Sequence, residues 1–110
     1  MAEPTLQEIF GTGATQDANT LTIQKSALAA KGLNSSANNT AESLLTAIML
    51  QAAENLTENA RSSDTLNRSM TITYSGQDLL DSGGVTFRRD TFITTLYKQT
   101  QLASINPNDY

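Results

Sequence analysis

The feature that most constrains this chain is an amphipathic helical pattern that runs from Asn39 to about Ser62. Asn39 stands three residues before Glu42, which is the spacing of an N-cap with its capping carboxylate. Apolar residues then recur at three- and four-residue steps and fall on one helix face: Ala41, Leu44, Leu45, Ile48, Met49, Ala52, Ala53 and Leu56. The pattern predicts one main helix that buries this face. Leu50 lies beside the face and leaves open whether the helix contacts one surface or two.

Strand patterns stand on both sides of this helix. Thr20–Gln24 and Met70–Tyr74 alternate polar and apolar residues, as half-buried strands do. Val85–Lys98 is rich in Thr, Phe, Ile and Tyr, and predicts one long strand or a bent pair that is apolar on both faces. We expect Gln77–Gly84 to be a loop.

The two ends of the chain carry short apolar groups. Pro4–Phe10 predicts a helix that Gly11 and Gly13 terminate. A helix this short does not persist alone in water, so its apolar side docks either on the same subunit or on another one. Thr100–Tyr110 is polar and turn-prone, and forms either a free tail or an arm that becomes ordered on a partner.

These elements predict an α+β fold in which one main amphipathic helix packs on a small, mostly antiparallel sheet. A short N-terminal helix and an extended C-terminal arm complete it. A chain of 110 residues makes one small domain with a thin core. We expect residues 1–18 to hold the N-terminal helix and a loop, residues 19–99 the core, and residues 100–110 the arm.

The composition argues against several classes of chemistry. The chain contains no His and no Cys, so it lacks the residues of a structural zinc site and the usual base partner for a nucleophile. Asp78 with Asp81, and Glu54 with Glu58, are predicted to be solvated acids, because neither pair offers enough ligands or enough burial for metal binding or acid–base work. We therefore expect no enzyme activity, no cofactor and no metal site.

Charge and hydropathy restrict the classes of partner that the chain is expected to bind. A net charge of −4 does not suit a nucleic-acid binder, which carries a basic surface for the phosphates. The longest purely apolar run, Ala47–Leu50, is far shorter than a membrane span. The acidic N-terminus has no apolar secretory segment, so synthesis and residence in a reducing cytoplasm fit best.

Four segments carry a resemblance to a known class: Thr5–Gly11, Leu21–Ile23, Asn38–Leu45 and Asn106–Tyr110. In order and character they resemble the small virion proteins encoded in structural gene clusters of tailed bacteriophages, including phages of cyanobacterial hosts. The resemblance implies a non-enzymatic protein made in the host cytoplasm and located in the virion. It implies many symmetric copies at the capsid surface, neck, tail or baseplate, joined to each other and to other virion proteins by strand pairing and terminal arms.

The apolar residues nearest the ends and on the long strand are the predicted interface: Leu6, Ile9, Phe10, Phe92, Leu96, Ile105 and Tyr110. Two alternatives stay open. One is a monomeric adaptor domain that adds a partner strand to the edge of its sheet. The other is a small enzyme or ligand-binding domain, which needs a concave pocket with convergent polar groups.

Overall fold

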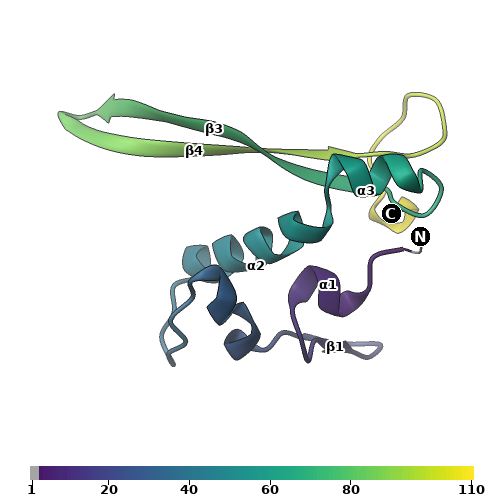
Figure 1. Cartoon of the computed structure of the whole chain (residues 1–110), viewed down its shortest axis with the longest axis horizontal. Coiled ribbons are helices and arrows are strands. Elements are labelled where there is room, and N and C mark those ends of the chain that lie inside the picture. Colours follow the sequence, from purple (N-terminus) through teal and green to yellow (C-terminus); the bar gives the residue numbers. More distant parts are fainter. Residues whose placement is uncertain (1–2) are drawn as a thin grey trace.

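The central element of the structure is α2 (Ala41–Asn55), against which the N-terminal helix, the 3-10 helix that precedes α2 and the longest strand pack (Figure 1). The computed structural model describes residues 3–110. The elements around α2 are, in chain order, α1 (Leu6–Phe10), β1 (Thr15–Gln16), β2 (Leu21–Thr22), the 3-10 helix η1 (Lys25–Lys31), α3 (Glu58–Ser63), β3 (Met70–Ser82), β4 (Val85–Leu96) and the 3-10 turn η2 (Pro107–Asp109). Both strand pairs, β1–β2 and β3–β4, are antiparallel. The predicted α+β class, with a helix packed on an antiparallel sheet, is confirmed.

The N-cap of α2 is Thr40, and the prediction of Asn39 was wrong by one residue. The Thr40 side chain accepts a hydrogen bond from the backbone N–H of Ser43, 3.1 Å away. Asn39 instead ties the preceding loop together, because its side chain accepts from the Ser36 N–H and donates to the Asn34 carbonyl. Thr40 can take the place of Asn39 as the N-cap because the threonine hydroxyl, like the asparagine side-chain oxygen, accepts a hydrogen bond from a backbone N–H of the first turn.

The predicted single helix to Ser62 divides into α2 and α3. The carbonyl of Leu56 accepts a hydrogen bond from the N–H of Ile72 in β3, 2.9 Å away, so it is not available to continue the helix. Thr57 then starts α3 by accepting from the Ala60 N–H. The buried Arg68 side chain donates to the Asn55 carbonyl at the end of α2, 3.0 Å away.

Two small apolar clusters lie on α2. The first is centred on Leu28, Leu33 and Ala47, with Ile23, Leu44 and Ile48 beside them. The second is centred on Ala52, Leu56 and Ile72, with Ile9, Met49, Ala53, Met70 and Phe92 beside them. Leu45 belongs to neither cluster and is 67% exposed, so its predicted core position was wrong. The buried face of α2 is narrower than the apolar face predicted from the sequence, because Ala47 is the residue of α2 that is buried against η1.

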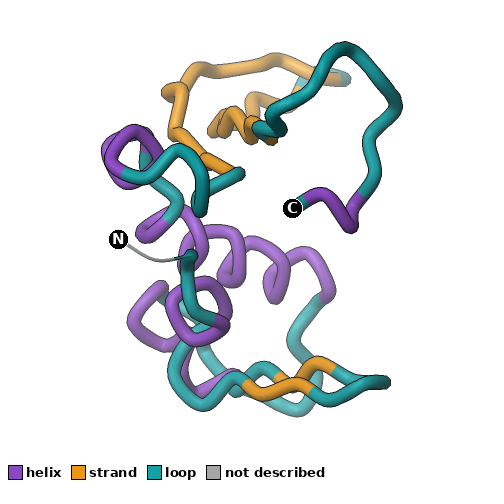
Figure 2. Tube along the Cα trace, turned by 90° about the vertical axis from the view of Figure 1, so that its right-hand side faces the viewer, coloured by secondary structure: helices purple, strands orange, loops and turns teal. Residues whose placement is uncertain are grey.

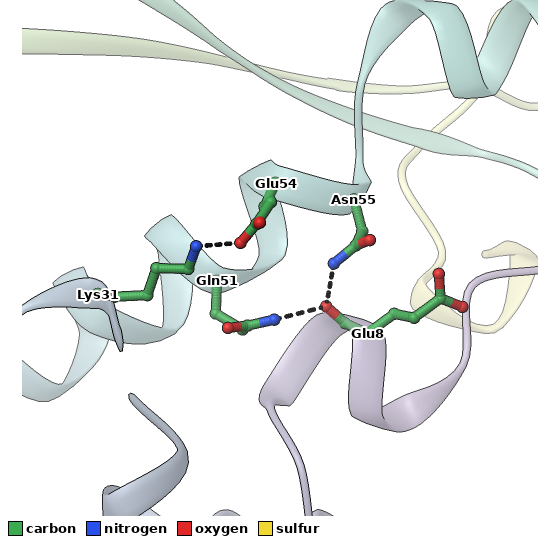
Figure 3. A network of polar contacts seen from close by, with 5 residues as sticks. All are labelled: Glu8, Lys31, Gln51, Glu54 and Asn55. Carbon is green, nitrogen blue, oxygen red and sulfur yellow. Dashed lines mark hydrogen bonds and ion pairs between the residues drawn. The ribbon is translucent and has the colours of Figure 1, made fainter. Parts of the chain in front are cut away.

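Polar side chains attach α1 and η1 to α2 (Figure 3). Gln51 and Asn55 both donate to the backbone carbonyl of Glu8, over 3.1 and 2.7 Å. Lys31 at the end of η1 forms an ion pair with Glu54. The N-terminal helix therefore docks on its own subunit, which was one of the two expected arrangements.

The early strand is much shorter than predicted. Of Thr20–Gln24 only Leu21–Thr22 is extended and paired, and its partner is Thr15–Gln16. Leu21 is exposed, whereas Ile23 packs beside the first cluster. Two residue pairs supply too few ladder hydrogen bonds and too little covered area for a longer sheet to form here.

The most prominent feature is the β3–β4 hairpin, which projects beyond the helices (Figure 1). Seen along its length, the hairpin lies to one side of the helical part (Figure 2). The radius of gyration is 16.3 Å, compared with about 13 Å expected for a compact domain of this length. The predicted strand at Val85 is confirmed, but the prediction of a loop at Gln77–Gly84 was wrong, since β3 continues to Ser82.

The C-terminal segment leaves β4 and loops back toward the N-terminal part of the chain (Figure 1). Lys98 and Asp109 form an ion pair at 3.1 Å, and η2 brings Tyr110 beside Ile9 and Met70. The predicted C-terminal arm is thus folded back on its own chain, with a bend at residues 99–102 and the 3-10 turn η2 near its end.

Candidate interaction surface

The turn of the hairpin is formed by Gly83 and Gly84, with φ angles of +60° and +81°. A two-residue turn of this kind requires positive φ at both positions, which glycine adopts without steric cost. It pairs Ser82 with Val85, and this pair sets the register of the whole ladder.

A bulge at Ser75 divides the hairpin into a root, near the helices, and a distal half. Successive residues of a strand point to opposite faces, so the register assigns each residue to a face. The face that packs on α2 at the root, here called the α2 face, carries Met70, Ile72, Tyr74, Gln77, Leu79 and Asp81 of β3, with Thr86, Arg88, Asp90, Phe92, Thr94 and Leu96 of β4. The opposite face carries Thr71, Thr73, Asp78, Leu80 and Ser82 of β3, with Val85, Phe87, Arg89, Thr91, Ile93 and Thr95 of β4.

The root of the hairpin is covered. Ile72 and Phe92 on the α2 face contact the second cluster, and the Phe92 ring lies 5.1 Å from that of Tyr74. On the opposite face Thr71 is completely buried, and α3 contacts β3 here. The Arg61 guanidinium of α3 lies 3.8 Å from the centre of the Tyr97 ring, a cation–π contact just beyond β4.

The distal half is covered on neither face. Every residue from Gln77 to Thr91 is exposed. Large apolar side chains are among them: Leu79 is 72% exposed and Phe87 52%, and Leu80 and Val85 are exposed as well. Leu80 lies directly opposite Phe87 in the ladder, and Val85 lies on the same face. A two-stranded hairpin is at best marginally stable in water, and this one carries four large apolar side chains in its distal half without cover.

Charged groups on the distal half are paired with one another. On the opposite face the Arg89 side chain donates through Nε to Asp78 at 2.8 Å, and this contact lowers the pKa of the Asp78 carboxyl. On the α2 face Asp90 accepts from the Tyr74 hydroxyl at 2.8 Å and from Arg88 Nε at 3.0 Å. The Tyr74 contact is the main reason why the pKa of Asp90 is lowered and that of Tyr74 raised.

The structure does not bring the two acids Asp78 and Asp81 together. Asp78 and Asp81 lie on opposite faces, and the Asp81 carboxylate accepts a hydrogen bond from the Thr86 hydroxyl at 2.6 Å. Within residues 3–110, no three acidic side chains converge on a position where an ion could bind. Three of these side-chain contacts join β3 to β4 and support the ladder: Arg89–Asp78, Tyr74–Asp90 and Thr86–Asp81.

The two edges of the hairpin differ. α2 and α3 both contact β3, and β3 also carries the bulge, which interrupts a regular ladder. β4 contacts extensively only β3 among the described elements. Its outer edge therefore presents unpaired backbone groups along the whole exposed stretch from Val85 to Thr91.

The residues predicted as interface fall into two environments. Leu6, Ile9 and Phe10 are half-buried in α1, which packs on α2 of the same chain. Ile9 and Phe92 contact the second cluster, so intramolecular packing already accounts for their apolar character.

The other three predicted residues lie at the end of β4 and in the C-terminal segment. Leu96 and Tyr110 are partly covered and line a common hollow, together with Ile105. Ile105 itself is 75% exposed. The structure brings these three together, but away from the distal half of the hairpin.

Sequence reasoning missed the distal apolar residues Leu79, Leu80, Val85 and Phe87. The signal for them was present, because two glycines between two strand-like runs are a strong indication of a tight hairpin. Gly76 and the two acids of Gln77–Ser82 have low strand propensity and favoured a loop instead.

Helices of the described part of the chain are too short and too polar to cross a membrane. Comparisons of the chain with protein-family models, with curated protein sequences and with solved structures found no match.

Proposed function

We propose that this protein is a non-enzymatic structural subunit of a phage virion, located at the tail, baseplate, neck or capsid surface. It is made in the host cytoplasm and assembles in several copies, with itself and with other virion proteins. The resemblance of four segments to small virion proteins supports the class. The single observation that carries the assembly role is the distal half of the β3–β4 hairpin, which is uncovered on both faces.

The exposed apolar side chains of the hairpin supply the free energy for the proposed association. Complete burial of a fully exposed Leu or Phe side chain contributes about 1.5–3 kcal/mol before the costs of association. Leu80 and Phe87 are 43% and 52% exposed, so covering each of them contributes roughly half of that. An assembly that covers several of them at once also orders a hairpin that is marginal alone. Folding and assembly are thus coupled in the proposed subunit.

The composition fits the same role. Only 16% of the residues are charged, so neighbouring copies repel one another weakly. The two clusters on α2 are small, and a subunit with so thin a core gains much of its stability from its neighbours.

A second candidate function is a monomeric adaptor that binds a protein partner by strand addition. The outer edge of β4 favours it, because the regular backbone from Val85 to Thr91 is free to pair with an extended segment. The two candidates differ in what the isolated protein does: the subunit associates with itself, and the adaptor stays monomeric.

The test is the mass of the purified protein in solution, measured by light scattering over a concentration series, with thermal unfolding recorded on the same samples. We expect a defined oligomer whose melting temperature rises with concentration, because mass action stabilises the associated state. A monomer at every concentration, with a constant melting temperature, would contradict self-assembly and favour the adaptor.

A further inference from the structure

We infer that β4 pairs antiparallel with β4 of a second copy, about a two-fold axis at Arg89, so that two hairpins form one four-stranded sheet. This inference rests on the proposed self-assembly and names one of its contacts, the outer edge of β4, together with the register of that contact. The occupant of the exposed edge is thus another copy of the same chain.

The choice of edge follows from the fold. β4 is the outer strand, and α2 and α3 lie on the β3 side. The bulge at Ser75 interrupts β3, whereas β4 runs without interruption from Val85 to Leu96. A regular, uncovered strand is the edge that pairs most readily with another one.

The register follows from the order of side chains in β4. When Arg89 lies opposite its own copy, Arg88 lies opposite Asp90 of the second copy, and Asp90 opposite Arg88. These two opposite-charge pairs lie on the α2 face. On the other face, Val85 lies opposite Ile93 and Ile93 opposite Val85, and both residues are exposed in the single chain. Cross-strand pairs of both kinds stabilise a sheet.

The neighbouring registers lose this complementarity. A two-fold axis at Arg88 places that arginine against its own copy and moves Asp90 opposite Thr86, so no opposite-charge pair forms between the chains. An axis at Asp90 places two carboxylates against each other, and directly opposed like charges destabilise a sheet. With the axis at Arg89, each of the two opposed arginines stays bound to Asp78 of its own chain. Only this register also places Arg88 of each copy opposite Asp90 of the other.

A pair of reciprocal charge variants tests the register. Arg88→Asp and Asp90→Arg each destroy the Arg88–Asp90 contact within the chain, and each places like charges opposite one another across the proposed axis. We expect each variant alone to associate about tenfold more weakly than the wild type. An equimolar mixture restores opposite charges between the two chains only, so we expect association to recover in the mixture, measured by sedimentation velocity.

Cysteine cross-linking tests the axis independently, because the natural chain has no cysteine. In the proposed pair, position 89 lies about 4.5–5.5 Å, Cα to Cα, from its own copy, which is within disulfide reach. Position 86 lies six residues along the partner strand from its copy, about 20 Å away. We expect oxidised Arg89→Cys to form a disulfide-linked dimer rapidly, and the matched control Thr86→Cys not to do so.

The outcomes separate this inference from the proposed function. An associating wild type whose association neither variant weakens, or whose mixture does not recover, would overturn the β4 register and leave self-assembly standing. Equal cross-linking at positions 86 and 89 would overturn it in the same way. A wild type that stays monomeric at all concentrations would overturn both.

Discussion

Leu28→Ala is expected to lower the free energy of unfolding by about 2–5 kcal/mol. Leu28 is 1% exposed and is the centre of the first cluster, between Leu33 and Ala47. The substitution removes apolar contacts and leaves a cavity. The helices η1 and α2 cannot move together to close it without disturbing the Lys31–Glu54 ion pair that joins them. A small domain has a total stability of about 5–15 kcal/mol, so this loss brings it close to unfolding. Urea denaturation of dilute samples measures the change.

Leu45→Ala is the matched control, because it makes the same substitution on α2 at a side chain that is 67% exposed. We expect a change of less than about 0.5 kcal/mol in the monomer. The helical pattern alone predicts the opposite, namely a larger loss of stability for Leu45→Ala than for Leu28→Ala. Leu45 lies on the predicted apolar helix face, whereas Leu28 lies in a short alanine-rich segment. A larger loss for Leu45→Ala than for Leu28→Ala would contradict the packing of η1 on α2.

The double variant Leu80→Ser/Phe87→Ser is expected to weaken self-association by at least about tenfold. These two side chains lie opposite each other in the distal half of the hairpin and are both exposed on the same face. Because both are exposed in the single chain, their replacement leaves the two clusters on α2 intact. Light scattering over a concentration series measures the dissociation, and circular dichroism of dilute samples checks that the fold is retained.

Leu66→Ser is the control for this variant. Leu66 is 83% exposed, more than Leu80 or Phe87, but it lies in the loop between α3 and β3. We expect it to leave the mass in solution unchanged. If Leu66→Ser dissociated the protein and the hairpin variant did not, the assembling surface would lie at the root of the hairpin instead of its distal half.

Local sequence signals predicted the main helix, because the apolar steps from Leu44 to Leu56 and a cap beside Glu42 are properties of neighbouring residues. They did not predict where that helix ends. The end depends on the hydrogen bond from Ile72 to the Leu56 carbonyl, and on Arg68 reaching the Asn55 carbonyl. Both are contacts between distant parts of the chain, which no local pattern contains.

The same limit applies to the candidate surface. Gln77–Ser82 is extended because it pairs with Val85–Asp90 across the Gly83–Gly84 turn, although its own residues have low strand propensity. Apolar character alone also could not separate core from interface. Ile9 and Phe92 are apolar and enter the second cluster, whereas Leu79 and Phe87 are equally apolar and stay exposed.

The measurement that tests the central claim most directly is hydrogen–deuterium exchange of β4 as a function of protein concentration. In a single hairpin, every second backbone N–H of the outer strand points to solvent. We predict that exchange between Val85 and Ile93 slows as concentration rises, while exchange in α2 stays constant. An increase in mass with concentration, accompanied by protection elsewhere and by no change between Val85 and Ile93, would contradict assembly through the hairpin.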